Sequence, residues 1–144
     1  MTDDAHEYMV KVDWKHGRVG DLIIEGKQKV EISAPPEFDG PEGIISPEDL
    51  FVASATMCFM NGFVEFTKKM RIEFKSFECD AVGTLEKVER SFEVTKIDTK
   101  TKVVIDSEDN RKRIGRALEL AAKYCFIGNS MKCPITHDTD VVVV

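Results

Sequence analysis

The sequence predicts an α+β fold in which an antiparallel sheet packs on a buried central helix and on a second, amphipathic helix. Two observations support this prediction: strand-like alternation returns in three separate blocks, and two helix-like segments lie between the blocks. The chain has 144 residues, the size of one domain, and 42% of them are hydrophobic, which is enough for a sizeable core. We therefore expect a single domain over residues 1–144.

The first block predicts three short strands. Residues 8–13 alternate, a turn follows at 15–18, and two further strands are expected over 20–25 and 29–33. Prolines and glycines then recur closely over residues 34–43, where we expect no regular structure.

A central helix is expected to begin after Ser46 and to run to about Lys69. Ser46 suits the cap position, Pro47 suits the first helical position, and two carboxylates follow in the first turn. The middle of the segment has no broad polar face, so the helix must be covered on every side. Its longest apolar stretch, residues 50–64, is broken by polar and small residues and is too short to span a bilayer.

The second half of the chain predicts a hairpin, a helix and a final strand. Residues 72–85 and 92–105 alternate around a turn at 88–91, and a last strand is expected over 135–144. A second helix starts at residues 107–110 and has one amphipathic face. The apolar positions of that face are Ile114, Ala117, Leu118, Ala121, Ala122 and Cys125.

Charge excludes one large class of partners. The chain carries 20 basic and 26 acidic residues, a net charge of −6, so a nucleic acid partner is not expected. Residues 1–7 have neither the positive nor the apolar region of a signal peptide, which favours a cytoplasmic protein with no membrane partner. Four cysteines in such a protein are not presumed to form structural disulfides, so their chemistry becomes the question.

Cys58 and Cys125 are the two cysteines that the pattern places on inward helix faces. Cys58 lies on a stripe with small residues in the middle, which leaves room beside its sulfur; alternatively it is a small buried hydrophobe. Cys125 ends the apolar face of the second helix. If the two helices pack together, a sulfenic acid on one cysteine could condense with the other, a pairing that geometry alone decides.

The remaining cysteines and histidines give weaker signals. Cys79 is expected on a strand, either as packing or half-exposed. Cys133 lies in a connection and could be exposed, and His137 is expected to face solvent rather than to act as a base. There is no Cys-x-x-Cys pair and no ligand-like histidine spacing, so no zinc site is expected.

A buried thiol reacts poorly unless a cation compensates for its burial. Arg18 is the one arginine in an early turn between strands without a cluster of like charge around it, and an acid such as Glu48 could hold its guanidinium in a fixed geometry. Composition alone does not select this pair.

Two motifs resemble the OsmC/Ohr family. Residues 46–59 are similar to the family's helix, which reads Ser/Asn-Pro-Glu-x-Leu-Phe/Leu, then small residues, then the first cysteine. Residues 121–125, followed by Gly-Asn-Ser at 128–130, resemble the second cysteine motif, and the two cysteines are 67 residues apart. In one departure, the peroxidase branches have Cys-Pro-x-Ser at the second motif, where this chain has Cys-Phe-Ile-Gly.

This resemblance implies an intertwined homodimer of α+β protomers with two sites at the interface. By resemblance, Cys58 corresponds to the cysteine that attacks hydroperoxides and Cys125 to the resolving cysteine. Arg18 corresponds to the arginine that steadies the thiolate, and Glu48 to its acidic partner. The resemblance implies no cofactor: no metal, flavin or haem is needed.

Two functions remain open at this point. The first is a cysteine-dependent peroxidase in oxidative stress defence that reduces organic hydroperoxides and is restored by an external dithiol. The second is a non-catalytic sensor or binding protein on the same fold, with an apolar pocket at the interface. Peroxide consumption in the presence of a dithiol distinguishes them.

Overall fold

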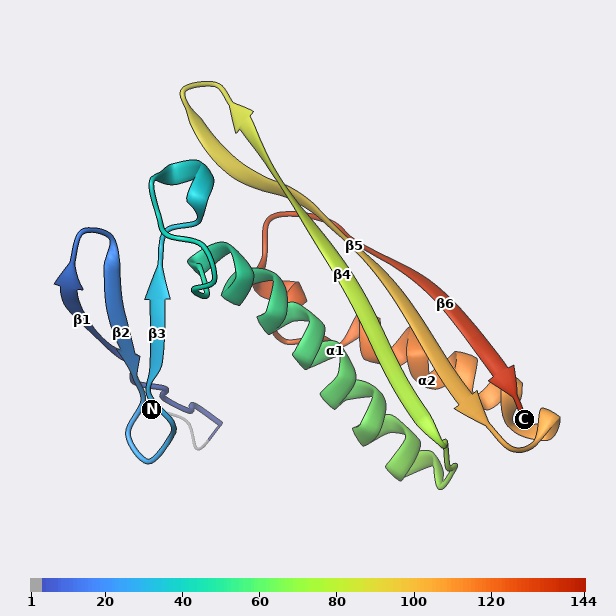
Figure 1. Cartoon of the computed structure of the whole chain (residues 1–144). Coiled ribbons are helices and arrows are strands. Elements are labelled where there is room, and N and C mark those ends of the chain that lie inside the picture. The colour runs from blue at the N-terminus through green and yellow to red at the C-terminus, as the bar shows by residue number, and fades with distance from the viewer. Residues whose placement is uncertain (1–3) are drawn as a thin grey trace. The chain divides into compact units, whose positions relative to one another are not determined.

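The computed structural model of the chain describes residues 4–144 (Figure 1). It divides into two compact units, one ending at Leu50 and one spanning Phe51–Val144. The prediction of one domain over 1–144 therefore stays a prediction. The acidic segment 1–7 that argued against a signal peptide begins outside the described residues.

The first unit holds a three-stranded antiparallel sheet in the order β1-β2-β3. Gly17, at a φ of 53°, makes the tight turn between the first two strands. The loop that was expected to be irregular contains one turn of 3-10 helix, Pro36–Phe38, because a proline can start such a turn. The strands are β1 Lys11–His16, β2 Val19–Ile23 and β3 Val30–Ser33.

Helix α1, Pro47–Met70, starts where the sequence predicts. The backbone N–H of Asp49 donates to Ser46 Oγ at 3.1 Å, and the N–H of Ser46 donates to Asp49 Oδ2 at 3.0 Å, so each residue caps the other. By length and composition alone α1 could cross a membrane, contrary to the expectation from the sequence. α1 packs in the core of the second unit, and the core helices of soluble proteins can have the same length and apolar composition as a membrane-spanning helix.

The second unit has a three-stranded sheet in the order β4-β5-β6. Strands β4, Ser76–Val88, and β5, Ser91–Ile105, form the expected antiparallel hairpin. Strand β6, Ile135–Val143, instead runs parallel to β5, which corrects the prediction of an all-antiparallel sheet. The reason is α2, Arg111–Lys123, which carries the chain back so that β6 enters in the direction of β5.

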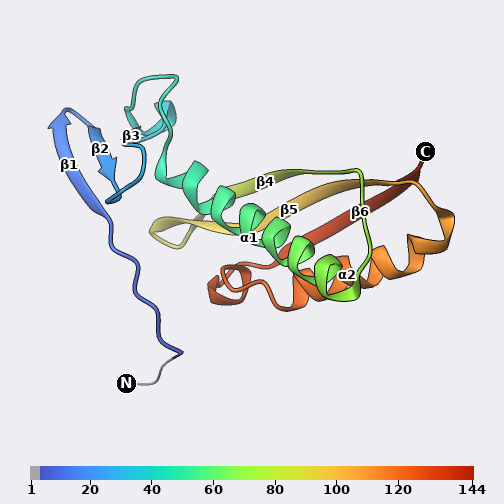
Figure 2. The same cartoon turned by 90° about the horizontal axis from the view of Figure 1, so that it is seen from below.

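Both helices cover the same face of this sheet (Figure 2). They approach closely at Gly62, where an added Cβ would lie 3.4 Å from Ala121 Cα and Cβ. Around this crossing the core is fully buried; its largest members are Phe59, Phe63, Val103, Ile105 and Ile114. The α+β prediction with two helices on a sheet is confirmed.

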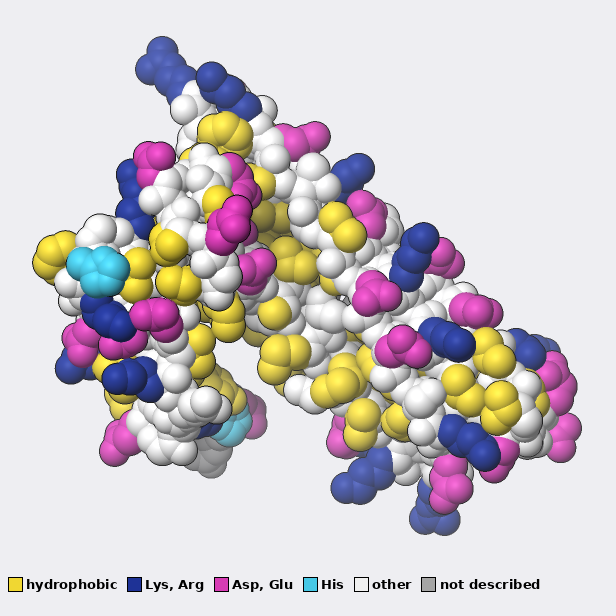
Figure 3. All heavy atoms as spheres, viewed as in Figure 1, with side chains coloured by type: hydrophobic (Ala, Val, Ile, Leu, Met, Phe, Trp, Pro, Cys, Tyr) yellow, Lys and Arg dark blue, Asp and Glu magenta, His cyan; other side chains and the backbone are white. Residues whose placement is uncertain are grey.

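The other side of α1 is open in the single chain. Met57, Met60 and Val64 are 60%, 40% and 44% exposed, and Figure 3 shows hydrophobic side chains at the surface along this helix. The expectation that α1 is covered on every side is therefore not met by one protomer.

Candidate functional site

Cys58 and Cys125 lie in contact inside the second unit. Cys58 is half-buried in the middle of α1, and Cys125 follows the end of α2. Burial raises the pKa of the Cys125 thiol, a hydrogen bond from the Gly128 backbone opposes this rise, and a hydrogen bond with Cys58 adds to it. The question that the sequence left open is thus answered in part: the two cysteines are close enough for Cys58 to raise the pKa of the Cys125 thiol.

Small residues make this contact possible. Besides the close helix crossing at Gly62, the turn after α2 depends on Gly128, whose N–H donates to Cys125 Sγ at 3.3 Å. A Cβ on residue 128 would lie 3.3 Å from that sulfur and 3.2 Å from Ile135 Cδ1. The Cys125 thiol itself points to Ala55 O at 3.9 Å on α1, so its sulfur is held between the two helices.

A cavity of about 400 Å³ lies beside Cys125. Cys58 belongs to the described residues but is not part of its wall, so the pocket reaches the cysteine pair from the Cys125 side. The wall is mainly apolar, with a few polar groups. Its lining includes Phe59, Thr99, Cys125, Asn129, Cys133 and His137.

His137 lines this pocket, which corrects the prediction that it faces solvent. Its ring packs on Phe59 with centroids 4.4 Å apart, and its Nδ1 lies 3.1 Å from Thr99 Oγ1. Burial lowers the pKa of His137. The alternation of side chains along the strand could have predicted this orientation. His137 is an even number of residues from Ile135, Val141 and Val143, so its side chain lies with theirs on the face of the strand that packs on the helices.

The tautomer of His137 follows from the neighbouring hydrogen bonds. The Thr99 hydroxyl donates to Thr136 O at 2.9 Å, which uses its single hydrogen. Thr99 Oγ1 must then accept from His137 Nδ1–H, and Nε2 keeps a free lone pair in the neutral ring. His137 is therefore set up to accept a proton in the pocket.

The other two cysteines differ from one another. Cys133 is buried, with 8% of its surface exposed, and packs with Ala55 and Ile97, so the expectation of an exposed thiol is wrong. It is buried because the connection before β6 packs against α1 and β5 at these two residues. Cys79 is half-buried on β4 and accepts a hydrogen bond from Thr101 Oγ1 at 3.3 Å.

Arg18 and Glu48 do not pair in the first unit. Arg18 is 3.9 Å from Asp39, and both of these side chains are exposed. Glu48 lies in the first turn of α1, and its Oε1 is buried without a hydrogen-bond partner among the described residues. A buried carboxylate oxygen without a donor is costly, so this position suits a cation that the single chain does not supply.

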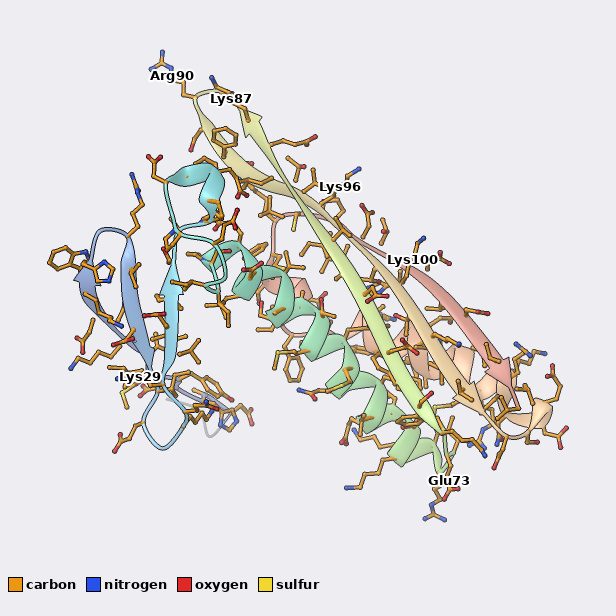
Figure 4. The ribbon with its side chains drawn as sticks, viewed as in Figure 1. Lys29, Glu73, Lys87, Arg90, Lys96 and Lys100 are labelled. Carbon is orange, nitrogen blue, oxygen red and sulfur yellow. The ribbon has the colours of Figure 1, made fainter. Side chains whose placement is uncertain are left out.

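Several cations project from the sheet of the second unit. Lys87 and Arg90 project from the tip of the β4–β5 hairpin, and Lys96 and Lys100 project from β5 (Figure 4). Among residues 4–144, no cluster of three or more His, Cys, Asp or Glu side chains could hold a metal ion.

A family model described as OsmC-like protein matches residues 40–140. The chain belongs to the OsmC-like family. It is 23% identical over 132 residues to the uncharacterized protein YmaD of Bacillus subtilis strain 168, covering 88% of this chain and 87% of YmaD. The resemblance drawn from the two cysteine motifs is thus confirmed.

Solved structures agree with this family. An OsmC-like protein of unknown function from Vibrio cholerae is 26% identical, with a TM-score of 0.86, over 94% of this chain and 100% of that one. An organic hydroperoxide resistance protein OsmC from Legionella pneumophila is 21% identical, with a TM-score of 0.71, over 96% of this chain and 98% of that one. The second likeness shows the fold alone.

Proposed function

We propose that the protein is a thiol-dependent peroxidase that reduces organic hydroperoxides to alcohols in defence against oxidative stress. The observation that supports this proposal is that Cys58 of α1 lies next to Cys125, which follows the end of α2. In the proposed cycle the Cys58 thiolate attacks the distal peroxide oxygen, the alcohol leaves, and Cys58 becomes a sulfenic acid. Cys125 condenses with it to a disulfide and releases water, and an external dithiol reduces the disulfide.

The substrate class follows from the side chains around Cys58. On the same helix, Phe59 and Phe63 are buried, and Met57 and Met60 are exposed. Such apolar side chains favour an alkyl or aryl hydroperoxide over hydrogen peroxide, because binding the organic part of the substrate removes apolar surface from water.

Stoichiometric cumene hydroperoxide is expected to form an intramolecular Cys58–Cys125 disulfide in the reduced protein. Cys58 raises the pKa of the Cys125 thiol, so the two cysteines are near neighbours, as a disulfide requires. Peptide mapping by mass spectrometry after alkylation of free thiols checks this result. Cys125 recovered as a free thiol, or Cys133 found in its place, would contradict the pairing.

A sensor on the same fold is the second candidate, and the exposed apolar side of α1 as a partner surface favours it. A sensor consumes about one equivalent of hydroperoxide and then stops, whereas a peroxidase consumes many equivalents when dithiothreitol is present. Measuring cumene hydroperoxide loss with and without dithiothreitol separates the two functions.

The proposed functional form is a homodimer, in which a second copy covers α1 and supplies the cation for Glu48. Met57, Met60 and Val64 form the exposed apolar side, and such a surface is rarely left open to water. We expect multi-angle light scattering at micromolar concentration to give the mass of a dimer, about twice the 16.2 kDa of the chain. A monomeric mass would contradict this form of the protein.

A further inference from the structure

The pocket beside Cys125 has no part in the peroxide step as described above. We propose that it is the entry site for the reducing thiol, which attacks Cys125 of the disulfide while His137 Nε2 takes up the thiol proton. This inference rests on the proposed peroxidase cycle and assigns its second half to residues of the pocket. The ligand is an alkyl thiol.

The position of the pocket selects the sulfur that is attacked. A thiolate attacks one sulfur of a disulfide in line with the S–S bond, and the other sulfur leaves. Cys125 lines the pocket and Cys58 does not, so a thiol in the pocket meets Cys125 with Cys58 behind it as the leaving group. Only 5% of the surface of Cys125 is exposed, so a thiol has little access to the Cys125 sulfur except through the pocket.

The acidities of the sulfurs favour the same direction. A disulfide sulfur leaves more slowly as the pKa of its thiol rises. Burial and the neighbouring Cys58 raise the pKa of the Cys125 thiol, so Cys125 is a poor leaving group. Attack at Cys58, which would expel Cys125 as a buried thiolate, is disfavoured.

His137 has the geometry of a proton acceptor for this step. Thr99 holds Nδ1–H, Phe59 packs on the ring, and the ring forms part of the pocket wall. Because the pKa of His137 is lowered by burial, the ring is neutral at pH 7 and Nε2 is free to accept.

The step balances as a two-electron exchange. The first thiol of a dithiol loses its proton to His137, its sulfur bonds to Cys125 Sγ, and the S–S bond breaks to release the Cys58 thiolate. The second thiol of the reductant passes its proton to the Cys58 thiolate, and its sulfur attacks the reductant sulfur that is bound to Cys125. Cys125 leaves as a thiolate and takes up the proton held by His137. The dithiol is oxidised to its disulfide, and the protein returns to two reduced cysteines ready for the next hydroperoxide.

Mixed-disulfide mapping tests the site of attack. The Cys58–Cys125 disulfide is formed with diamide, treated briefly with 2-mercaptoethanol, quenched in acid with N-ethylmaleimide, and mapped by mass spectrometry. We expect mercaptoethanol on Cys125 and maleimide on Cys58. Mercaptoethanol on Cys58 or Cys133, or failure of diamide to form the disulfide, would overturn the proposal.

The role of His137 is tested by timing the reduction step. In His137→Gln we expect reduction of the diamide-formed disulfide by dithiothreitol to slow by at least about tenfold, the lower range for loss of a general base. His16→Gln, which replaces an exposed histidine of β1, is the matched control and should reduce at the wild-type rate. Equal rates in both variants would overturn the proton-acceptor role, and the mapping of the wild-type protein stands even if His137→Gln does not fold.

Because diamide forms the disulfide without peroxide, the two proposals fail separately. If diamide closes the disulfide and cumene hydroperoxide does not, the peroxidase proposal fails while the route of thiol entry is still measured. If both oxidants close it and mercaptoethanol maps to Cys58, only the present inference fails.

Discussion

Cys58→Ser is expected to abolish turnover of cumene hydroperoxide, with a fall of at least about a thousandfold in the rate per protomer. The reason is chemical: a thiolate attacks the peroxide oxygen, and a serine hydroxyl at neutral pH is neither ionised nor comparably nucleophilic. Turnover is followed as loss of hydroperoxide with dithiothreitol in excess. The exchange of sulfur for oxygen removes little volume from a half-buried position, so folding should survive.

Cys79→Ser is the matched control for this prediction. Cys79 is also half-buried in the second unit, but it lies on β4 and contacts Thr101 instead of another cysteine. We expect it to keep nearly all of the wild-type rate. Wild-type turnover in Cys58→Ser would exclude Cys58 as the attacking group, and an equal loss in both variants would indicate damage to the fold rather than loss of a nucleophile.

Local signals predicted the helices well. The reciprocal cap of Ser46 and Asp49 is a short-range signal, and α1 begins at the predicted residue. The prediction of the hairpin was less accurate: its first strand was expected to begin at residue 72, whereas β4 begins at Ser76. Arg71, at a φ of 57°, turns the chain after α1, and Ile72 packs in the core from a connection rather than from a strand.

Long-range features were harder to predict from the sequence. The direction of β6 depends on where α2 returns the chain, which no local pattern encodes. Burial of Cys133 depends on that return as well, because the connection that carries it passes beside Ala55. Both errors come from this return of the chain, which is also the reason that the pocket lined by Cys125 and Cys133 was not expected.

Of the four predicted site residues, the structure brings together Cys58 and Cys125, the two that the helix periodicity of the sequence had placed facing inward. Cys58 lies on α1, and Cys125 lies just beyond the end of α2 rather than on its last turn, yet the close approach of α1 and α2 at Gly62 still brings the two cysteines together. Arg18 and Glu48 were predicted by resemblance, and their roles stay predictions. In the first unit Arg18 pairs with Asp39 instead of Glu48.

The place where Glu48 acts follows from the length of α1. The alternative that the helix begins near Phe51 is wrong, because α1 already begins at Pro47. Glu48 and Cys58 are then ten residues apart on one helix, a rise of about 15 Å. A pair formed by Glu48 and an arginine does not span that gap, so we propose that Glu48 serves the Cys58 of a second protomer.

Heterodimers test this arrangement with a large change in rate. A chain with Cys58→Ser and a chain with Glu48→Ala are co-expressed with different tags, and the heterodimer is purified through both. If Glu48 acts on the other protomer, the heterodimer combines one intact Cys58 with one intact Glu48 and recovers about half of the wild-type rate, since one of two sites works. If Glu48 acts within its own chain, every site lacks one of the two groups. A heterodimer no more active than the Glu48→Ala homodimer would rule out the shared site, and the Cys58→Ser homodimer sets the background because it lacks the attacking sulfur in both sites.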